Sequence, residues 1–216
     1  MWDENRFDLR EPNWNYRIIR MLEYLKGYDT GFIKSFMDCG AGGQHLKNYL
    51  PDDTVYIPVD YTGKWGGNVR ICNFNDGEFC EEYVDCVFLS GILEYIDDYA
   101  AFIKNCCKYS NKVVSLSYNT TDLRGDIVTR ESKGWNCHIS KQCITDEFKK
   151  NGFNLIVIDD AEYDGQKIET YFLFEKDGIP SNYYDKSRVP EMGWKLNIGC
   201  GTDWRKGFLT SMEVRR

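Results

Sequence analysis

The 216-residue sequence has only five prolines and two histidines, no long apolar run and no block of basic residues. No uncharged apolar stretch reaches the ~18 residues of a membrane-spanning helix, and the start Met1-Trp2-Asp3-Glu4 lacks the pattern of a signal peptide. Lys and Arg are scattered and the formal net charge is −7, whereas affinity for nucleic acid comes from clustered cations. We therefore expect a soluble, cytoplasmic protein that binds neither membrane nor nucleic acid and acts on a small molecule.

The nine cysteines follow neither a metal-binding nor a disulfide pattern. There is no CxxC pair, and Cys137, His138 and Cys143 match no zinc spacing, so no metal is expected. An odd number of cysteines without a secretion signal indicates free thiols. Several fall in apolar stretches, where cysteine behaves as a small hydrophobic side chain: Cys39, Cys86, Cys106 and Cys107.

The central feature of the sequence is a glycine-rich stretch, FMDCGAGGQHL, at residues 36–46. An apolar run ends in Asp38, glycines follow at 40, 42 and 43, and Leu46 and Leu50 lie four residues apart, which predicts a strand, a tight turn and a helix. Glycines in such a turn let backbone N–H groups approach a ligand closely. The dinucleotide fingerprint G-x-G-x-x-G would need a glycine where His45 stands.

An acid that closes the first strand and is followed by G-x-G resembles the first motif of class I S-adenosylmethionine (SAM) dependent methyltransferases. That motif reads D/E-x-G-x-G-x-G, and here Gln44 stands in place of the last glycine. The segment SGILEYIDD, residues 90–98, resembles the fourth motif of the same family, a serine-x-x-leucine-glutamate-aromatic sequence before an acidic pair. The resemblance covers about residues 17–176.

The resemblance implies an α/β fold with a Rossmann-like, doubly wound sheet of seven strands, mostly parallel with an antiparallel last strand. The hydrophobic pattern agrees, since it predicts helices over 14–25, 101–107 and 141–151, the last capped by Ser140. It also predicts strands over 32–37, 55–59, 69–72, 84–89, 112–117, 153–158 and 168–174, of which the last two form an antiparallel pair.

The expected cofactor is SAM, and the family's motifs assign residues to it. Asp60 closes the second strand, where a carboxylate accepts both ribose hydroxyls, although an aspartate after a strand is also a common turn residue. Asn73 stands where the family has an aspartate for adenine, with Phe74 beside the ring; a plain turn is the alternative. The full set of cofactor-binding candidates is Asp38, Gly40, Ala41, Gly42, Asp60, Asn73, Phe74, Ser90, Gly91 and Glu94.

The long polar segment at residues 120–134 is expected to be a functional lid or a binding loop. His138 follows it and is the candidate general base, because imidazole titrates near neutrality; a structural histidine at a helix start is the alternative. Arg124 and Arg130 are candidates to meet an anionic acceptor, or else solvated charges. The substrate-binding candidates are Tyr95, Tyr118, Asn119, Arg124 and Trp135.

A second glycine motif occurs in the tail. After a polar linker, residues 194–204 read WKLNIGCGTDW and resemble the first motif again, with Asn197, Gly199 and Gly201 in the matching places. Too few residues follow for a second cofactor site. We predict a methyltransferase-like domain over 1–176, followed over 177–216 by a linker and a truncated second first motif; a chance match is the alternative.

The sequence thus predicts a SAM-dependent methyltransferase that acts on an oxygen or nitrogen of a small molecule, with surface-glycan or secondary-metabolite biosynthesis suggested by the resemblance alone. Two alternatives remain open. One is a non-catalytic SAM-fold module of a larger assembly, which the Gln44 and Asn73 departures favour. The other is an NAD-dependent oxidoreductase on a similar sheet. The sequence does not indicate the oligomeric state.

Overall fold

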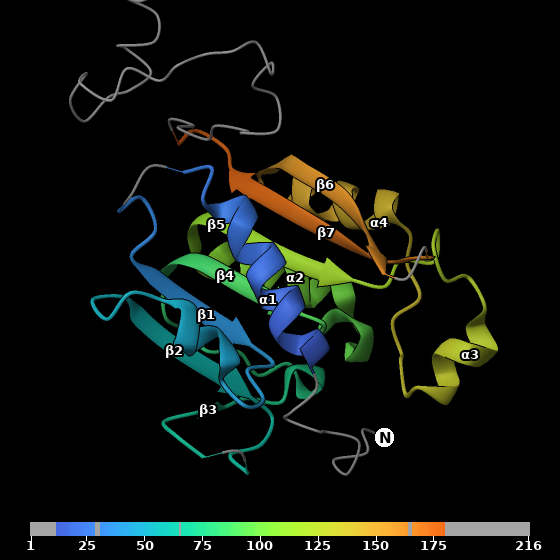
Figure 1. The fold of residues 1–216 in the computed structure, drawn as a ribbon, viewed down its shortest axis with the longest axis horizontal. Coiled ribbons are helices and arrows are strands. Elements are labelled where there is room, and N and C mark those ends of the chain that lie inside the picture. Colours follow the sequence, from blue (N-terminus) through green and yellow to red (C-terminus); the bar gives the residue numbers. More distant parts are fainter. Residues whose placement is uncertain (1–11, 29–30, 65, 164–165, 180–216) are drawn as a thin grey trace, which may run out of the picture. The chain divides into compact units, whose positions relative to one another are not determined.

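The computed structural model describes residues 12–28, 31–64, 66–163 and 166–179 (Figure 1). The chain divides into two compact units, Met1–Tyr184 and Asp185–Arg216, and all described residues belong to the first. The predicted second glycine motif at 194–204 lies outside the described residues, so the predicted domain boundary at 176 stays a prediction. No helix in the described part of unit 1 is long and apolar enough to span a membrane.

A single seven-stranded sheet forms the centre of the first unit, in the order β3-β2-β1-β4-β5-β7-β6. The neighbouring strands β3, β2, β1, β4 and β5 pair in parallel, and β7 pairs antiparallel with both β5 and β6. The predicted fold class is confirmed. The strands are β1 (Ser35–Cys39), β2 (Val55–Asp60), β3 (Arg70–Ile71), β4 (Val84–Ser90), β5 (Ser110–Tyr118), β6 (Phe153–Tyr163) and β7 (Gln166–Lys176).

Helices cover both faces of the sheet (Figure 1). Side chains alternate between the faces along each strand, so Phe36 and Phe88 pack with Ile18 and Met21 of α1 (Pro12–Leu25). Met37, Val87 and Leu116 belong to the opposite core. That core is closed by α2 (Tyr99–Tyr109) and α4 (Lys141–Lys150). All eight described cysteines are free thiols and all but Cys143 are buried.

The connections are shorter and less helical than predicted. The expected helix after the glycine turn is only the five-residue 3-10 helix η2 (His45–Tyr49). Pro51 explains its length, because a residue before proline favours extended backbone, and Leu50 is extended with φ −90° and ψ 146°. Two further 3-10 helices follow β3 and β4, η3 (Phe74–Asp76) and η4 (Leu93–Tyr95).

The predicted loop 120–134 contains a short helix, α3 (Ile127–Ser132), capped by Asp126, whose Oδ1 accepts from the N–H of Val128. Ser140 caps α4 as predicted, because its Oγ accepts from the N–H of Cys143 at 3.2 Å. A loop prediction based on polar composition therefore missed a helix whose polar residues cap it.

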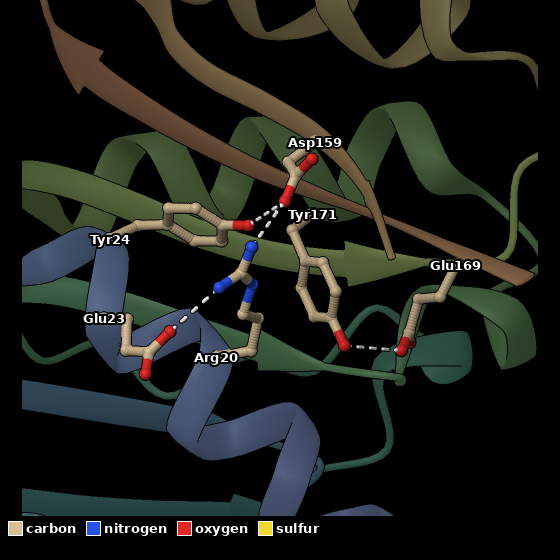
Figure 2. A network of polar contacts seen from close by, with 6 residues as sticks. All are labelled: Arg20, Glu23, Tyr24, Asp159, Glu169 and Tyr171. Carbon is tan, nitrogen blue, oxygen red and sulfur yellow. Dashed lines mark hydrogen bonds and ion pairs between the residues drawn. The ribbon is translucent and has the colours of Figure 1, made fainter. Parts of the chain in front are cut away.

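Strands β6 and β7 form a hairpin that runs beyond the predicted strand ends. The polar stretch after residue 158 was predicted to be a connection, yet Asp159 continues β6 and is paired from α1. Figure 2 shows Tyr24 donating to Asp159 and the Arg20 guanidinium bonding the same carboxylate, with Nη2 3.1 Å from Oδ2. A long-range partner thus holds the polar end of the strand and ties α1 to the hairpin.

Candidate functional site

The carboxyl ends of β1, β2 and β4 converge on the glycine turn that follows β1. The N–H groups of Gly40 and Ala41 both donate to the carbonyl of Val59, at 2.8 and 3.1 Å, which holds the turn against β2. Gly40 has φ 77°, and a Cβ there would lie 3.0 Å from the side chain of Ile92. A side chain here would be strained and would displace Ile92, so the turn lies tightly between the ends of β2 and β4.

Gln44 takes the backbone conformation that the missing glycine would take. Its φ is 57°, the one positive φ of a non-glycine residue among those described. A left-handed conformation costs an L-residue about 1–2 kcal/mol. The Gln44 side chain offsets this by donating from Nε2 to the carbonyl of Gly66 at 2.6 Å, which ties the turn to the loop after β2. A residue with a side chain thus occupies this left-handed position, and its side chain helps to hold the turn in place.

Asp60 and Asp38 are buried carboxylates on either side of the turn. Asp60 accepts the N–H of Gly42 at 2.9 Å through Oδ2 and that of Thr62 at 3.2 Å through Oδ1. Asp38 accepts from the hydroxyl of Tyr56 at 2.8 Å. Among the described residues, no lysine, arginine or histidine side chain forms an ion pair or a hydrogen bond with either carboxylate. Both acids therefore place negative charge at the turn when they are ionised.

Burial changes the protonation of both carboxyls. Desolvation raises the pKa of Asp38 to about 7; the Tyr56 hydrogen bond opposes this rise and the charge of Asp60 adds to it. Burial also raises the pKa of Asp60, while the N–H groups of Gly42 and Thr62 oppose the rise. A cation bound between the two would favour their ionised forms.

A small cavity of about 30 Å³ lies at the turn. This is far below the ~300–1,000 Å³ of typical small-molecule pockets. The cavity is lined by Ile18, Asp38, Gly40, Ala41, Gly42, Gly43, His45 and Ser90. The structure thus brings together five of the predicted cofactor residues: Asp38, Gly40, Ala41, Gly42 and Ser90.

Asn73 and Phe74 are engaged elsewhere. The Asn73 side chain accepts from the N–H of Asn75 and donates to Asp76 at 2.7 Å, as a turn residue does. Phe74 packs edge-on against Phe102 of α2, with ring centroids 5.0 Å apart. Their roles in binding adenine remain predictions. To bind the ring, both side chains would have to give up the contacts that they make here.

The fourth-motif segment folds back over the end of β5. Gly91 has φ 69°, and its missing side chain makes room for Arg17 of α1, because a Cβ there would lie 2.1 Å from Arg17 Nη1. The buried Glu94 accepts from both the backbone N–H and the side-chain amide of Asn119, at 2.9 and 2.8 Å. Tyr95 is half-buried and its carbonyl accepts from Asn75. The segment thereby joins the ends of β4 and β5.

Arg130 is a fully buried cation that organises the segment after β5. Nη1 donates to the carbonyls of Asn119 and Arg124, and Nη2 donates to the hydroxyl of Tyr118 and the carbonyl of Cys137. Nε donates to Nδ1 of His138 at 3.0 Å. Five bonds to neutral acceptors match the five N–H donors of a guanidinium. The sequence predicts that Arg130 contacts an anionic methyl acceptor or solvent. In the structure its side chain instead holds together the backbone and side chains of the segment after β5.

The remaining substrate candidates surround Arg130. Its guanidinium lies 5.1 Å from the ring centroid of the buried Trp135. Tyr118 is fully buried in the core on the α2 side, and its hydroxyl donates to the carbonyl of Cys137. Arg124 is half-buried. His138, Tyr118 and Trp135 therefore share contacts with Arg130, whereas Asn119 is the candidate that also touches the fourth-motif segment.

Sequence reasoning missed four polar residues beside this segment, Arg17, Ser117, Glu169 and Tyr171. Arg17 Nε pairs with Glu169 at 2.8 Å, and Glu169 also accepts from Tyr171 (Figure 2). Two features of the sequence could have drawn attention to two of them: Glu169 lies just before the apolar run of β7, and Arg17 directly precedes Ile18 on the apolar face of α1.

No protein-family model and no curated protein matches the chain, but solved structures do. A putative SAM-dependent methyltransferase from Listeria monocytogenes superposes with a TM-score of 0.59 at 11% identity, over 74% of this chain and 97% of that one. The 1,6-didemethyltoxoflavin-N1-methyltransferase of Burkholderia thailandensis, with bound 1,6-didemethyltoxoflavin and S-adenosylhomocysteine (SAH), gives a TM-score of 0.56 at 13% identity, over 78% of this chain and 80% of that one.

Magnesium protoporphyrin IX methyltransferase from Synechocystis PCC 6803, with bound SAH, gives a TM-score of 0.55 at 12% identity, over 76% of this chain and 82% of that one. At these identities the likeness establishes a common fold. Together with the strand order, it confirms the fold predicted from the glycine turn and the fourth-motif segment.

Proposed function

We propose that this chain, which has the class I SAM-dependent methyltransferase fold, binds SAM and transfers its methyl group to an oxygen or nitrogen of a small molecule. The observation that carries the proposal is the contact of Asp60 with Gly42. It sets an acid at the end of β2 directly against the glycine turn, where a carboxylate can hold ribose hydroxyls. Asp38 adds a second buried carboxylate on the other side of the turn.

The charge of the site suits this cofactor. SAM carries a sulfonium and an ammonium, and two buried carboxylates without a basic partner among the described residues favour such a cationic ligand. When bound, SAM supplies a methyl group that is already activated, so the protein's own task is to align the acceptor and exclude water. Asp60 would hold the ribose, the turn the methionine part, and Ser90 the side that faces β5.

The same features argue against a dinucleotide. Its pyrophosphate needs the N-terminus of a full helix after the glycine turn. Here that place holds a five-residue 3-10 helix without a side-chain cap. Asp38 and Asp60 would also repel the two phosphates. The oxidoreductase alternative is therefore disfavoured by geometry and by charge.

A non-catalytic SAM-fold module is the second candidate, and the Arg130–His138 bond favours it. Nδ1 of His138 is already an acceptor, so the predicted base can take a proton only after this contact breaks. Turnover separates the two functions. Transfer of labelled methyl from SAM to a metabolite of a cell extract supports the enzyme, while SAH binding without transfer supports the module.

A further inference from the structure

Five polar residues, four of them buried and one half-buried, lie between α1 and the ends of β4, β5 and β7, outside the cavity at the glycine turn. We call Arg17, Glu94, Ser117, Glu169 and Tyr171 the carboxylate cluster. The cluster adjoins the candidate cofactor site, because Ser90 lines the cavity at the turn and pairs in register with Ser117 on the neighbouring strand. Its position on the β5 side of Ser90 makes it a candidate for the acceptor.

Glu169 is fully partnered within the cluster. Its Oε1 lies 2.8 Å from Arg17 Nε, and its Oε2 accepts from the hydroxyl of Tyr171 at 3.1 Å. Figure 2 shows the side chains of Tyr171 and Glu169, both from β7, pointing toward each other beside α1. Arg17 thus forms an ion pair with Glu169, and its charge also acts on Glu94, where it opposes the rise in pKa that burial causes.

Glu94 is only half partnered. Both hydrogen bonds from Asn119 end on Oε1, and Oε2 is buried without a hydrogen-bond donor among the described residues. Ser117 Oγ, also buried, has no hydrogen-bond partner in the same part of the chain. Glu94 and Ser117 are 2% and 0% exposed. Buried polar atoms are nearly always satisfied in folded proteins, so two orphans beside a candidate cofactor site indicate a ligand.

We infer that Glu94 Oε2 and Ser117 Oγ form a subsite for a nitrogen that carries N–H groups, and that the methyl acceptor is an amine. A carboxylate and a hydroxyl oxygen both accept such hydrogen bonds. Two carboxylates against one described cation favour an ammonium over a carboxylate or phosphate. Methylation would require the neutral amine, so the bound ammonium would first give a proton to Glu94 Oε2, a carboxyl whose pKa burial raises. The amine would then present its lone pair to the methyl group. This inference rests on the proposed function, and it moves Glu94 from the predicted cofactor set to the acceptor side.

An ammonium group could come from the acceptor or from SAM itself, and the test separates these sources. Thermal unfolding is measured at constant ionic strength in n-butylammonium chloride, in sodium chloride, and in sodium chloride with n-butanol, each with and without saturating SAH. The inference predicts that n-butylammonium alone raises the unfolding temperature, and that the increase persists with SAH. An increase that SAH abolishes would assign the subsite to the cofactor's own ammonium and overturn the acceptor assignment.

Variants identify the carboxylate. Glu94→Gln keeps an oxygen for Asn119 and should lose the n-butylammonium shift, and Ser117→Ala should reduce it. Glu147→Gln, which removes a carboxylate of α4 paired with Lys150, is the matched control and should keep it. An equal shift in Glu94→Gln, or no shift in the unaltered protein, would overturn the inference. SAH titration of the unaltered protein reports separately on the proposed function, which stands or falls with SAH binding.

Discussion

Nε of Arg130 donates a hydrogen bond to Nδ1 of His138 across 3.0 Å. A guanidinium has donors and no acceptor, so this bond requires a lone pair on Nδ1 and leaves the imidazole proton on Nε2. His138 is thereby prepared to donate a hydrogen bond rather than to remove a proton. The candidate base of the sequence prediction is held in the donor form by a residue that the prediction assigned elsewhere.

Nitrogen-15 NMR of the imidazoles should therefore show His138 with an unprotonated Nδ1 and a protonated Nε2 at pH 8. Only two histidines are present, so a His45→Asn variant leaves a single signal to assign. In Arg130→Met the preference for this tautomer should weaken. A His138 signal with the proton on Nδ1 in the unaltered protein would contradict the hydrogen bond.

Replacing Arg130 by lysine should destabilise the protein by about 2–4 kcal/mol, because an ammonium cannot reach five separated acceptors and leaves several of them unsatisfied in the interior. Urea unfolding measures the loss. Arg124→Lys, at a half-buried position in the same segment, is the matched control and should change the free energy of unfolding by less than about 0.5 kcal/mol. Similar small effects for both variants would rule out the scaffold role.

Gln44 offers a test of the glycine turn's geometry. Because φ is 57° there, Gln44→Val should cost about 1–2 kcal/mol more in unfolding free energy than Gln44→Gly, since a β-branched side chain is poorly tolerated in the left-handed region. Both variants lose the bond to Gly66, so their difference isolates the backbone conformation. Equal stabilities of the two would show that the turn is not left-handed at this position.

Asp38→Asn should raise stability in a pH-dependent way. The pKa of Asp38 is about 7 in the folded protein against ~3.9 when unfolded. The folded state therefore holds an extra proton between these values, and the stability of the parent protein falls as pH rises from ~4 to ~7. The gain of the variant over the parent should be near zero at pH 4 and on the order of 2–4 kcal/mol at pH 8.

Tyr56→Phe is the companion measurement for Asp38. The Tyr56 hydroxyl bonds the ionised carboxylate, so its removal should cost more at pH 8 than at pH 4. Denaturant unfolding at both values measures the two variants. A pH-independent gain for Asp38→Asn would mean that Asp38 ionises normally in the folded protein.

Much of the fold could be predicted from local pattern. Apolar runs closed by Asp38 and Ser90 located β1 and β4 within a few residues, and the family resemblance of the glycine turn and the fourth-motif segment implied a mostly parallel sheet of seven strands. The length of η2 could have been predicted too, because Pro51 limits the helix. The faces of β5 could have been read from alternation, since Ser117 and Tyr118 must point to opposite sides of the sheet.

The rest depended on long-range partners that no local pattern records. Asp159 was assigned to a loop because the sequence does not show that Arg20 and Tyr24 of α1 would pair with it. The role of Arg130 depends on carbonyl groups brought together from several turns. Glu169 could not be predicted as a site residue, because the sequence does not show that Arg17 of α1 lies beside it. Polar residues inside regular elements were thus the main source of error.

The most direct test of the proposed function is isothermal titration of the protein with SAH and with NAD, repeated for Asp60→Asn and Asp60→Ala. SAH should bind and NAD should not. Loss of a charged acceptor for the ribose is worth ~1.5–3 kcal/mol, so Asp60→Ala should weaken SAH binding at least about tenfold. Asp60→Asn, which still accepts from Gly42, should show whether the charge itself matters. NAD binding without SAH binding, or Asp60→Ala binding SAH as tightly as the parent, would contradict the proposed function.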